Sequence, residues 1–251
     1  MANYVSAMPL WAIVLFIGSF LYSIFFIAKR AKQAAINAGM ALNKAWAIQY
    51  GVFGFYVLYF AYVSILSLKG VLSAAAMPPR VAIFTTLPLT ILLFLIIGNT
   101  RLFKKLLRSI TLESLITIHI FRVIGVFFVL LYFYHLLPAN VAFSGEMGDI
   151  ITALLAFPVA NIVSKGKSWS IKAVYAWNIF GILDIVNVLI LVAIATQDSI
   201  LTGNHGVLEM TIFPFVWFPA FAPATILFLH TAVFRKLHQI KTVETSSSLL
   251  Q

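Results

Sequence analysis

The chain has 251 residues, of which 62% are hydrophobic and only 10% are charged. Soluble globular domains contain about 45–50% apolar and about 25% charged residues, so this composition excludes an ordinary soluble domain. The formal net charge is +10, but the basic residues form short clusters beside apolar segments. That pattern favours contact with the lipid bilayer, and with anionic lipids at its cytoplasmic face, over nucleic-acid binding. The chain has no cysteine, which excludes disulfides, thiolate metal sites and cysteine nucleophiles.

Seven long apolar segments follow one another along the chain, and each has about the length that crosses a hydrocarbon layer of roughly 30 Å as a helix. We predict membrane-spanning helices over Leu10–Ala28, Trp46–Leu68, Val81–Ile97, Leu115–Leu137, Met147–Val163, Ala173–Thr196 and Val207–Phe234. The sequence therefore predicts an all-α polytopic integral membrane protein. Residues 1–242 are expected to form a single seven-helix transmembrane domain, and residues 243–251 a disordered C-terminal tail.

Lysine and arginine gather in alternate connections between these segments. The connections after the first, third and fifth segments and the tail carry three or four basic residues each, the connection after the second carries only Lys69 and Arg80, and those after the fourth and sixth contain none. Basic connections stay in the cytoplasm, so the N-terminus is expected outside and the C-terminus inside. Two of the basic stretches, Ala31–Asn43 and Arg101–Ile110, are expected to be helical extensions or short interfacial helices.

Prolines interrupt three of the predicted helices, at Pro88, at Pro158 and at the trio Pro214, Pro219 and Pro223. Each proline removes a helical hydrogen bond and clashes with the preceding turn. In lipid, the carbonyl that loses its partner must find another inside the protein or in a wet cavity. We therefore expect a bent or broken seventh helix, and we count Trp217, which lies among its prolines, as a candidate ligand-binding residue.

Ionisable residues inside apolar segments are costly in lipid, which makes them candidates for function. The later segments contain four of them in their cytoplasmic halves: His119, Arg122, Asp184 and His230. At 1.5 Å per residue, all four lie within roughly 16 Å of the cytoplasmic edge. These residues come from the fourth, sixth and seventh helices, so they predict one shared polar pocket.

Arg122 is long enough to reach Asp184, and an unpaired guanidinium at that depth is difficult to sustain. Trp177 and Asn178 precede Asp184 on the sixth helix and are expected to line the same pocket. We predict that this pocket, formed among the fourth to seventh helices, binds a small ligand or an ion. The two histidines are expected to pass protons, and the protein is expected to be a transporter. An Arg122–Asp184 pair that only holds the bundle together is the alternative.

Acidic residues also occur near the opposite face, where Glu146 and Asp149 begin the fifth helix and Glu209 begins the seventh. These residues are candidates for an outer vestibule that attracts a cation or an amine. Acids in a first helical turn also cap free amides and interact favourably with the helix dipole, so capping alone is the alternative.

His119 and His230 lie at similar depth on different helices, so a membrane-embedded enzyme or a haem- or metal-binding protein is an alternative to a transporter. No paired-histidine helix motif is present, and we predict no resident cofactor. A sensory or structural subunit that needs a partner protein is a further alternative. The sequence leaves the ligand and the oligomeric state open.

Several short stretches of the chain carry a resemblance to known sequences. They are Met77-Pro78-Pro79-Arg80, His119-Ile-Phe-Arg122, Phe143-Ser-Gly-Glu-Met-Gly-Asp149-Ile150, Trp177-Asn178 and Phe213-Pro-Phe-Val-Trp217-Phe-Pro219, followed by Leu229-His230. In these stretches the chain resembles an uncharacterised family of bacterial polytopic membrane proteins, best represented among Bacteroidetes, over most of residues 77–237. The resemblance implies family membership and a multi-pass topology only, and we predict a location in the bacterial inner membrane. The family has no assigned activity, so the resemblance implies no particular chemistry.

Overall fold

The computed structural model describes residues 8–73, 76–203 and 206–248, with side chains as far as residue 242. All regular elements of the described chain are helices, and it has no strand. Seven of its helical segments are long and apolar enough to cross a membrane, which confirms the number predicted from the sequence. Many large apolar side chains on the outer faces of these helices are exposed, as a lipid environment requires.

The elements follow one another in chain order, and several predicted helices are composites of α, π and 3₁₀ turns. They are α1 (Leu10–Asn37), α2 (Leu42–Leu68), η1 (Ala82–Thr86), α3 (Leu87–Ile91), η2 (Leu92–Ile96), η3 (Ile97–Asn99), α4 (Arg101–Ser109), α5 (Leu112–Ile118), η4 (His119–Gly125), α6 (Val126–Phe133), η5 (Asn140–Gly145), α7 (Glu146–Ser164), α8 (Ser170–Thr202), η6 (Leu208–Thr211) and α9 (Trp217–Ser248). Of the extension predicted over Ala31–Asn43, the residues up to Asn37 form the last turns of α1, and the short helix predicted over Arg101–Ile110 is α4.

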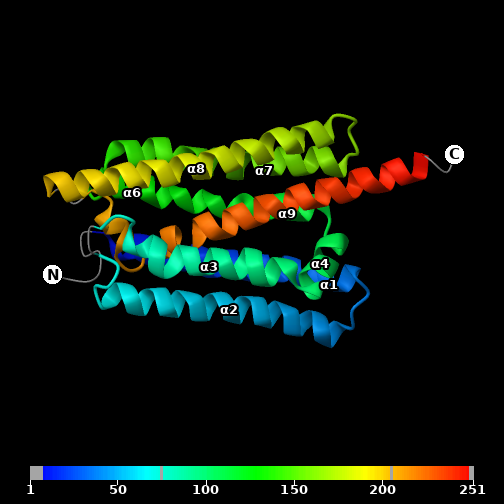
Figure 1. Cartoon of the computed structure of the whole chain (residues 1–251), viewed down its shortest axis with the longest axis horizontal. Coiled ribbons are helices and arrows are strands. Elements are labelled where there is room, and N and C mark those ends of the chain that lie inside the picture. Colours follow the sequence, from blue (N-terminus) through cyan, green and yellow to red (C-terminus); the bar gives the residue numbers. More distant parts are fainter. Residues whose placement is uncertain (1–7, 74–75, 204–205, 249–251) are drawn as a thin grey trace.

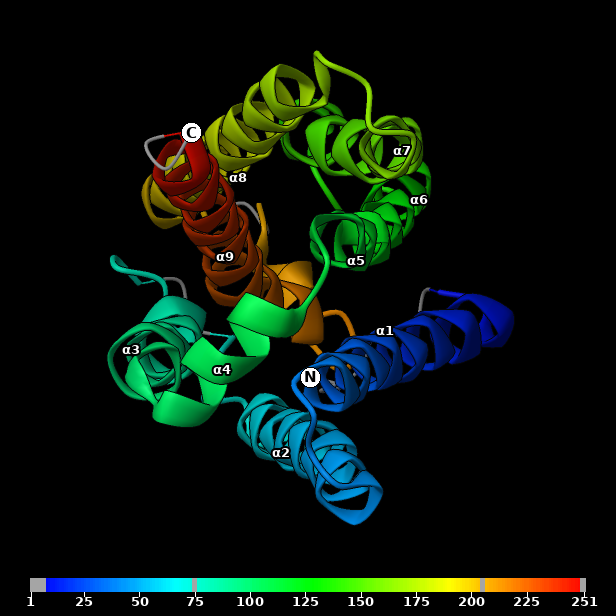
Figure 2. The same ribbon diagram turned by 90° about the vertical axis from the view of Figure 1, so that its right-hand side faces the viewer.

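The helices run side by side along the long axis of the molecule (Figure 1). The α1–α2 connection, α4, the α7–α8 connection and the C-terminal end of α9 all lie at one end, so the basic segments share that end. Seen from this end, α9 lies between a group formed by α1 to α4 and a group formed by α5 to α8 (Figure 2). In agreement with that view, α9 contacts α2 and α3 on one side and α5 and α8 on the other.

Two backbone carbonyls that lose a helical hydrogen bond to a proline accept a hydrogen bond from a hydroxyl group of a neighbouring helix. Pro88 has no N–H to offer the carbonyl of Phe84, which accepts a hydrogen bond of 2.9 Å from the Tyr62 hydroxyl. Pro223 likewise cannot donate to the carbonyl of Pro219, which accepts a hydrogen bond of 2.8 Å from the Thr86 hydroxyl. These bonds follow the expectation that freed carbonyls find partners within the protein, and they tie η1 to α2 and to α9.

The last span begins later than predicted. A 3₁₀ turn, η6, and an extended residue, Ile212, precede the start of α9 at Trp217. Pro219 therefore falls in the first turn of α9, where backbone N–H groups have no helical partner and proline costs least. At its other end, α9 continues to Ser248, whereas the sequence predicts disorder from residue 243; residues 249–251 lie outside the described chain.

Candidate functional site

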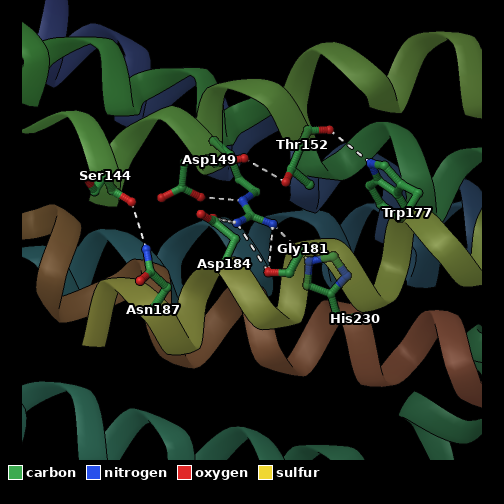
Figure 3. A network of polar contacts seen from close by, with 10 residues as sticks. Ser144, Asp149, Thr152, Trp177, Gly181, Asp184, Asn187 and His230 are labelled. Carbon is green, nitrogen blue, oxygen red and sulfur yellow. Dashed lines mark hydrogen bonds and ion pairs between the residues drawn. The ribbon is translucent and has the colours of Figure 1, made fainter. Parts of the chain in front are cut away.

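The centre of the bundle holds a fully buried guanidinium, that of Arg122 on η4. Its Nε donates to Asp149 of α7, and its Nη2 donates to Oδ2 of Asp184 of α8 at 2.6 Å. Its Nη1 lies 2.9 Å from Nε2 of His230 of α9. Figure 3 shows Asp149, Asp184 and His230 converging on this point from three helices. The predicted Arg122–Asp184 contact is thus present, and Asp149 is a second carboxylate partner.

The hydrogen bonds around His230 determine which ring nitrogen carries the proton. A guanidinium can only donate, so Nε2 of His230 accepts from Arg122. Nδ1 then carries the hydrogen and donates to Oδ1 of Asn178 at 2.7 Å. The Asn178 amide in turn donates to the backbone carbonyl of His230 at 3.2 Å. His230 is therefore a neutral imidazole with both nitrogens bonded.

Glycines allow the helices to approach closely enough for these contacts. A Cβ atom at Gly181 would lie 2.5 Å from Nε2 of His230 and 2.8 Å from Nη1 of Arg122. A Cβ atom at Gly148 would lie 1.6 Å from Oδ1 of Asp184. No larger residue fits at either position without displacing a member of the site.

The structure places Glu146 and Asp149 inside the bundle rather than in an outer vestibule, because both side chains are fully buried. The reason is that the fifth span begins with the π turn η5 at Asn140, earlier than the predicted start at Met147. At 1.5 Å per residue, this start carries Glu146 roughly 9 Å and Asp149 roughly 14 Å along the helix from its end. Glu209 lies apart from both, on η6, and is half-buried.

Two buried ionisable side chains in this region have no hydrogen-bond partner among the described residues. They are Glu146, at both carboxyl oxygens, and His119, at both ring nitrogens. Glu146 lies against Gly125 of η4, where a Cβ atom would come within 3.0 Å of its Oε2. The His119 ring packs against His230, with ring centroids 4.1 Å apart, and against Trp177. We call the set His119, Arg122, Glu146, Asp149, Asp184 and His230 the charge cluster.

Of the two tryptophans predicted to bind a ligand, one lies at the charge cluster and the other does not. Trp177 packs against the two histidines and donates from Nε1 to the Thr152 carbonyl at 3.0 Å, so it forms part of the wall. Trp217 does not join the cluster: its ring stacks on Phe60 and its Nε1 donates to the Ser64 hydroxyl at 2.8 Å.

The two histidines do not fit as ligands of a haem iron or of another metal ion. Both nitrogens of His230 already bond to Arg122 and Asn178. The two rings are in direct contact, which leaves no space for a metal centre between them. Among the described residues, no three acidic or histidine side chains are grouped so that they could hold a metal ion.

A comparison with known families finds a match, and it covers the segment that contains this site. Residues 78–238 match a family model described as a domain of unknown function, DUF8737. The chain belongs to this family. The matched segment includes every member of the charge cluster, so the site lies within the part of the chain that defines the family. No curated protein and no solved structure is significantly similar to the chain.

Proposed function

We propose that this DUF8737 member is a proton-coupled transporter of the bacterial inner membrane, with its basic end in the cytoplasm. The charge cluster would take up and release protons while a small solute or an ion crosses between the fourth and seventh spans. The single observation that supports this proposal is the composition of the cluster. One guanidinium faces three buried carboxylates, and the nearest imidazole, His230, is neutral.

The charges of such a cluster are not balanced by its own hydrogen bonds. Arg122 pairs with Asp149 and Asp184, whereas Glu146 lies beside them with no donor to its carboxyl oxygens. An ionised carboxylate without a partner costs several kcal/mol in a medium of low dielectric constant. The excess negative charge must therefore be balanced by protons on the carboxylates or by a cation that enters from outside. Binding of a proton or of a cation by buried carboxylates is the step that couples proton movement to transport.

A purely structural clamp would not need the two unpartnered groups. The Arg122–Asp149–Asp184 contacts alone join η4 to α7 and α8. Glu146 and His119 add desolvation cost and no hydrogen bond. Buried ionisable residues kept at such a cost are typical of proton pathways in membrane proteins.

The members of the cluster are arranged along the axis of the bundle. Glu146 lies against Gly125 at the C-terminal end of η4, the Arg122 contacts follow, and His119 lies one 3₁₀ turn from Arg122 toward the basic end. Figure 3 shows part of this order, with Ser144 and Asn187 on one side of Asp149 and Trp177 on the other. Protons would pass from Glu146 to Asp149, Asp184 and the histidines when water enters.

The test uses purified protein in liposomes that contain a pH-sensitive dye. A potassium gradient and valinomycin impose a membrane potential, and amino acids, sugars, nucleosides and inorganic ions are then added outside, one class at a time. We expect one class to drive proton entry in the wild type, and Glu146→Gln to abolish it. The matched control is Asp198→Asn, which neutralises an exposed acid of α8. Equal proton entry in wild type and Glu146→Gln, or none with any class, contradicts the proposal.

A further inference from the structure

A second feature of the bundle is an apolar cavity of about 610 Å³ at the end that carries the basic segments. It is enclosed by α1, the first half of α2, η2 and η3, α4, α5 and α9. Its volume falls within the range of about 300–1,000 Å³ that is usual for small-molecule sites. The charge cluster does not line it, so this cavity is separate from the proposed coupling site.

The lining offers an occupant almost nothing but hydrocarbon. Among the described lining residues, polar side chains are limited to Tyr56, Thr100 and Thr225. The Tyr56 hydroxyl lies 3.5 Å from that of Thr225. The Thr100 hydroxyl donates to the carbonyl of Ile97 at 2.7 Å and accepts from the amide of Phe103 in the first turn of α4. These polar atoms are already paired, so the cavity suits a hydrocarbon chain rather than a polar solute.

The cavity is open on the side where α2 faces α4. The lining residues Ala47 and Gly51 of α2 and Leu102 of α4 are exposed. In a seven-span membrane protein, that side faces the lipid at the level of the headgroup boundary, because α4 lies at the end of the bundle (Figure 1). An acyl chain of a neighbouring lipid can therefore enter sideways without leaving the bilayer.

The helix that covers this opening carries the positive charge. Phe103, Leu106 and Leu107 of α4 line the cavity. The basic residues of α4 are exposed and form no ion pair with any described residue; they are Arg101, Lys104, Lys105 and Arg108.

Contacts at both ends hold α4 in place. Thr100 caps its N-terminus, and Nζ of Lys236 on α9 donates to the carbonyl of Arg108 at 2.7 Å. The Phe103 ring also packs against Phe228 of α9, with centroids 4.9 Å apart. The basic face is therefore pre-organised above the cavity, and an anion that binds there does not have to order the helix.

We infer that the apolar cavity and the basic face of α4 form one binding site for an anionic glycerophospholipid. One acyl chain fills the cavity, and the phosphate lies on Lys104 and Lys105. Apolar contact and charge attraction act together, as for other interfacial helices. The site would bind a lipid molecule tightly enough to survive purification of the protein.

The test measures bound lipid by native mass spectrometry. Delipidated protein in detergent is given equimolar phosphatidylglycerol and phosphatidylcholine with the same acyl chains. We expect phosphatidylglycerol to be preferred by about fivefold for each basic side chain that reaches its phosphate. The double variant Lys104→Gln with Lys105→Gln should lose most of this preference. The control Lys167→Gln with Lys172→Gln removes exposed charge at the same end, on the α7–α8 side, and should keep it.

A second pair of variants tests the acyl chain. Gly51 lines the cavity and a Cβ atom there meets nothing within 4 Å, so Gly51→Leu fills space without a clash. Gly54→Leu is the matched control, because Gly54 is equally open on the same helix but does not line the cavity. Gly51→Leu should lose bound lipid and Gly54→Leu should keep it.

Three outcomes of the lipid-binding measurements overturn the inference. They are equal binding of the two lipids by the wild type, a phosphatidylglycerol preference that survives in the Lys104/Lys105 variant, and undiminished binding by Gly51→Leu. Glycerol phosphate, which has the phosphate but no acyl chain, should not compete at equal concentration. Competition by it would show a site for the headgroup alone and would also overturn the inference.

Discussion

Asp184 of α8 lies directly against Gly148 of α7, so that a Cβ atom at position 148 would be 1.6 Å from Oδ1 of Asp184. That distance is far below van der Waals contact, so the carboxylate occupies the space that any side chain at position 148 would need. The same carboxylate reaches Arg122 through its other oxygen. The absence of a side chain on α7 is therefore what allows α8 to bring its carboxylate to the guanidinium.

Gly148→Ala is expected to displace Asp184 and to lower the free energy of unfolding by about 1–3 kcal/mol, the usual cost of overpacking. The control is Gly54→Ala, where a Cβ atom meets open space and alanine should be neutral or slightly stabilising. Thermal unfolding in detergent measures both. Adding Asp184→Ala to Gly148→Ala should cost less than the sum of the single changes, because the clash is then absent. Strict additivity would contradict this account.

Arg122→Gln is expected to lower the free energy of unfolding by about 3–5 kcal/mol, because it leaves buried carboxylates without their counter-charge. Arg122→Lys should recover only part of the loss, since one ammonium cannot reproduce the separate bonds from Nε, Nη1 and Nη2. Combining Arg122→Gln with Asp149→Asn and Asp184→Asn should restore stability relative to Arg122→Gln alone. Wild-type stability of Arg122→Gln would rule out a buried ion-paired guanidinium.

The sequence predicts the helical scaffold and one of the two ion pairs of Arg122, for identifiable reasons. Hydropathy counts the spans reliably, and depth together with side-chain length brings Arg122 to Asp184. The sequence does not predict Asp149 as a partner of Arg122, because the stretch after Ala139 looks like a loop, whereas it forms the π turn η5. The spacing of Glu146 and Asp149 was the available signal, since residues three apart share one helix face.

A single sequence does not predict how each helix is rotated about its own axis, and so which side chains face the neighbouring helices. The contact between the rings of His119 and His230 depends on how α9 turns against η4, which tertiary packing decides. For the same reason Trp217, placed in the pocket by its position among prolines, faces Phe60 and Ser64 instead.

Thr86→Val is expected to lower the free energy of unfolding by about 1–3 kcal/mol, because it removes the hydroxyl that bonds to the carbonyl of Pro219. The control is Thr90→Val, which removes a hydroxyl that bonds only to the carbonyl of Thr86 within its own helical turn. That hydrogen bond joins two residues one turn apart and no neighbouring helix, so the change should stay within about 0.5 kcal/mol. Denaturant unfolding of the two variants and the wild type measures both changes in the free energy of unfolding. Equal losses would show that the Thr86 hydroxyl has no special role beside Pro223.

The orientation of the bundle is open to a direct test because the chain contains no cysteine. Single cysteines are introduced at two exposed positions, Lys167→Cys in the α7–α8 connection and Ala139→Cys in the connection before η5. If basic connections are retained in the cytoplasm, a membrane-impermeant maleimide added to intact cells should label Ala139→Cys. Lys167→Cys should react only after the membrane is permeabilised. The reverse pattern would place the basic end outside, and with it α4 and the proposed lipid site, whereas labelling of both positions from outside would contradict a fifth span between α6 and α8.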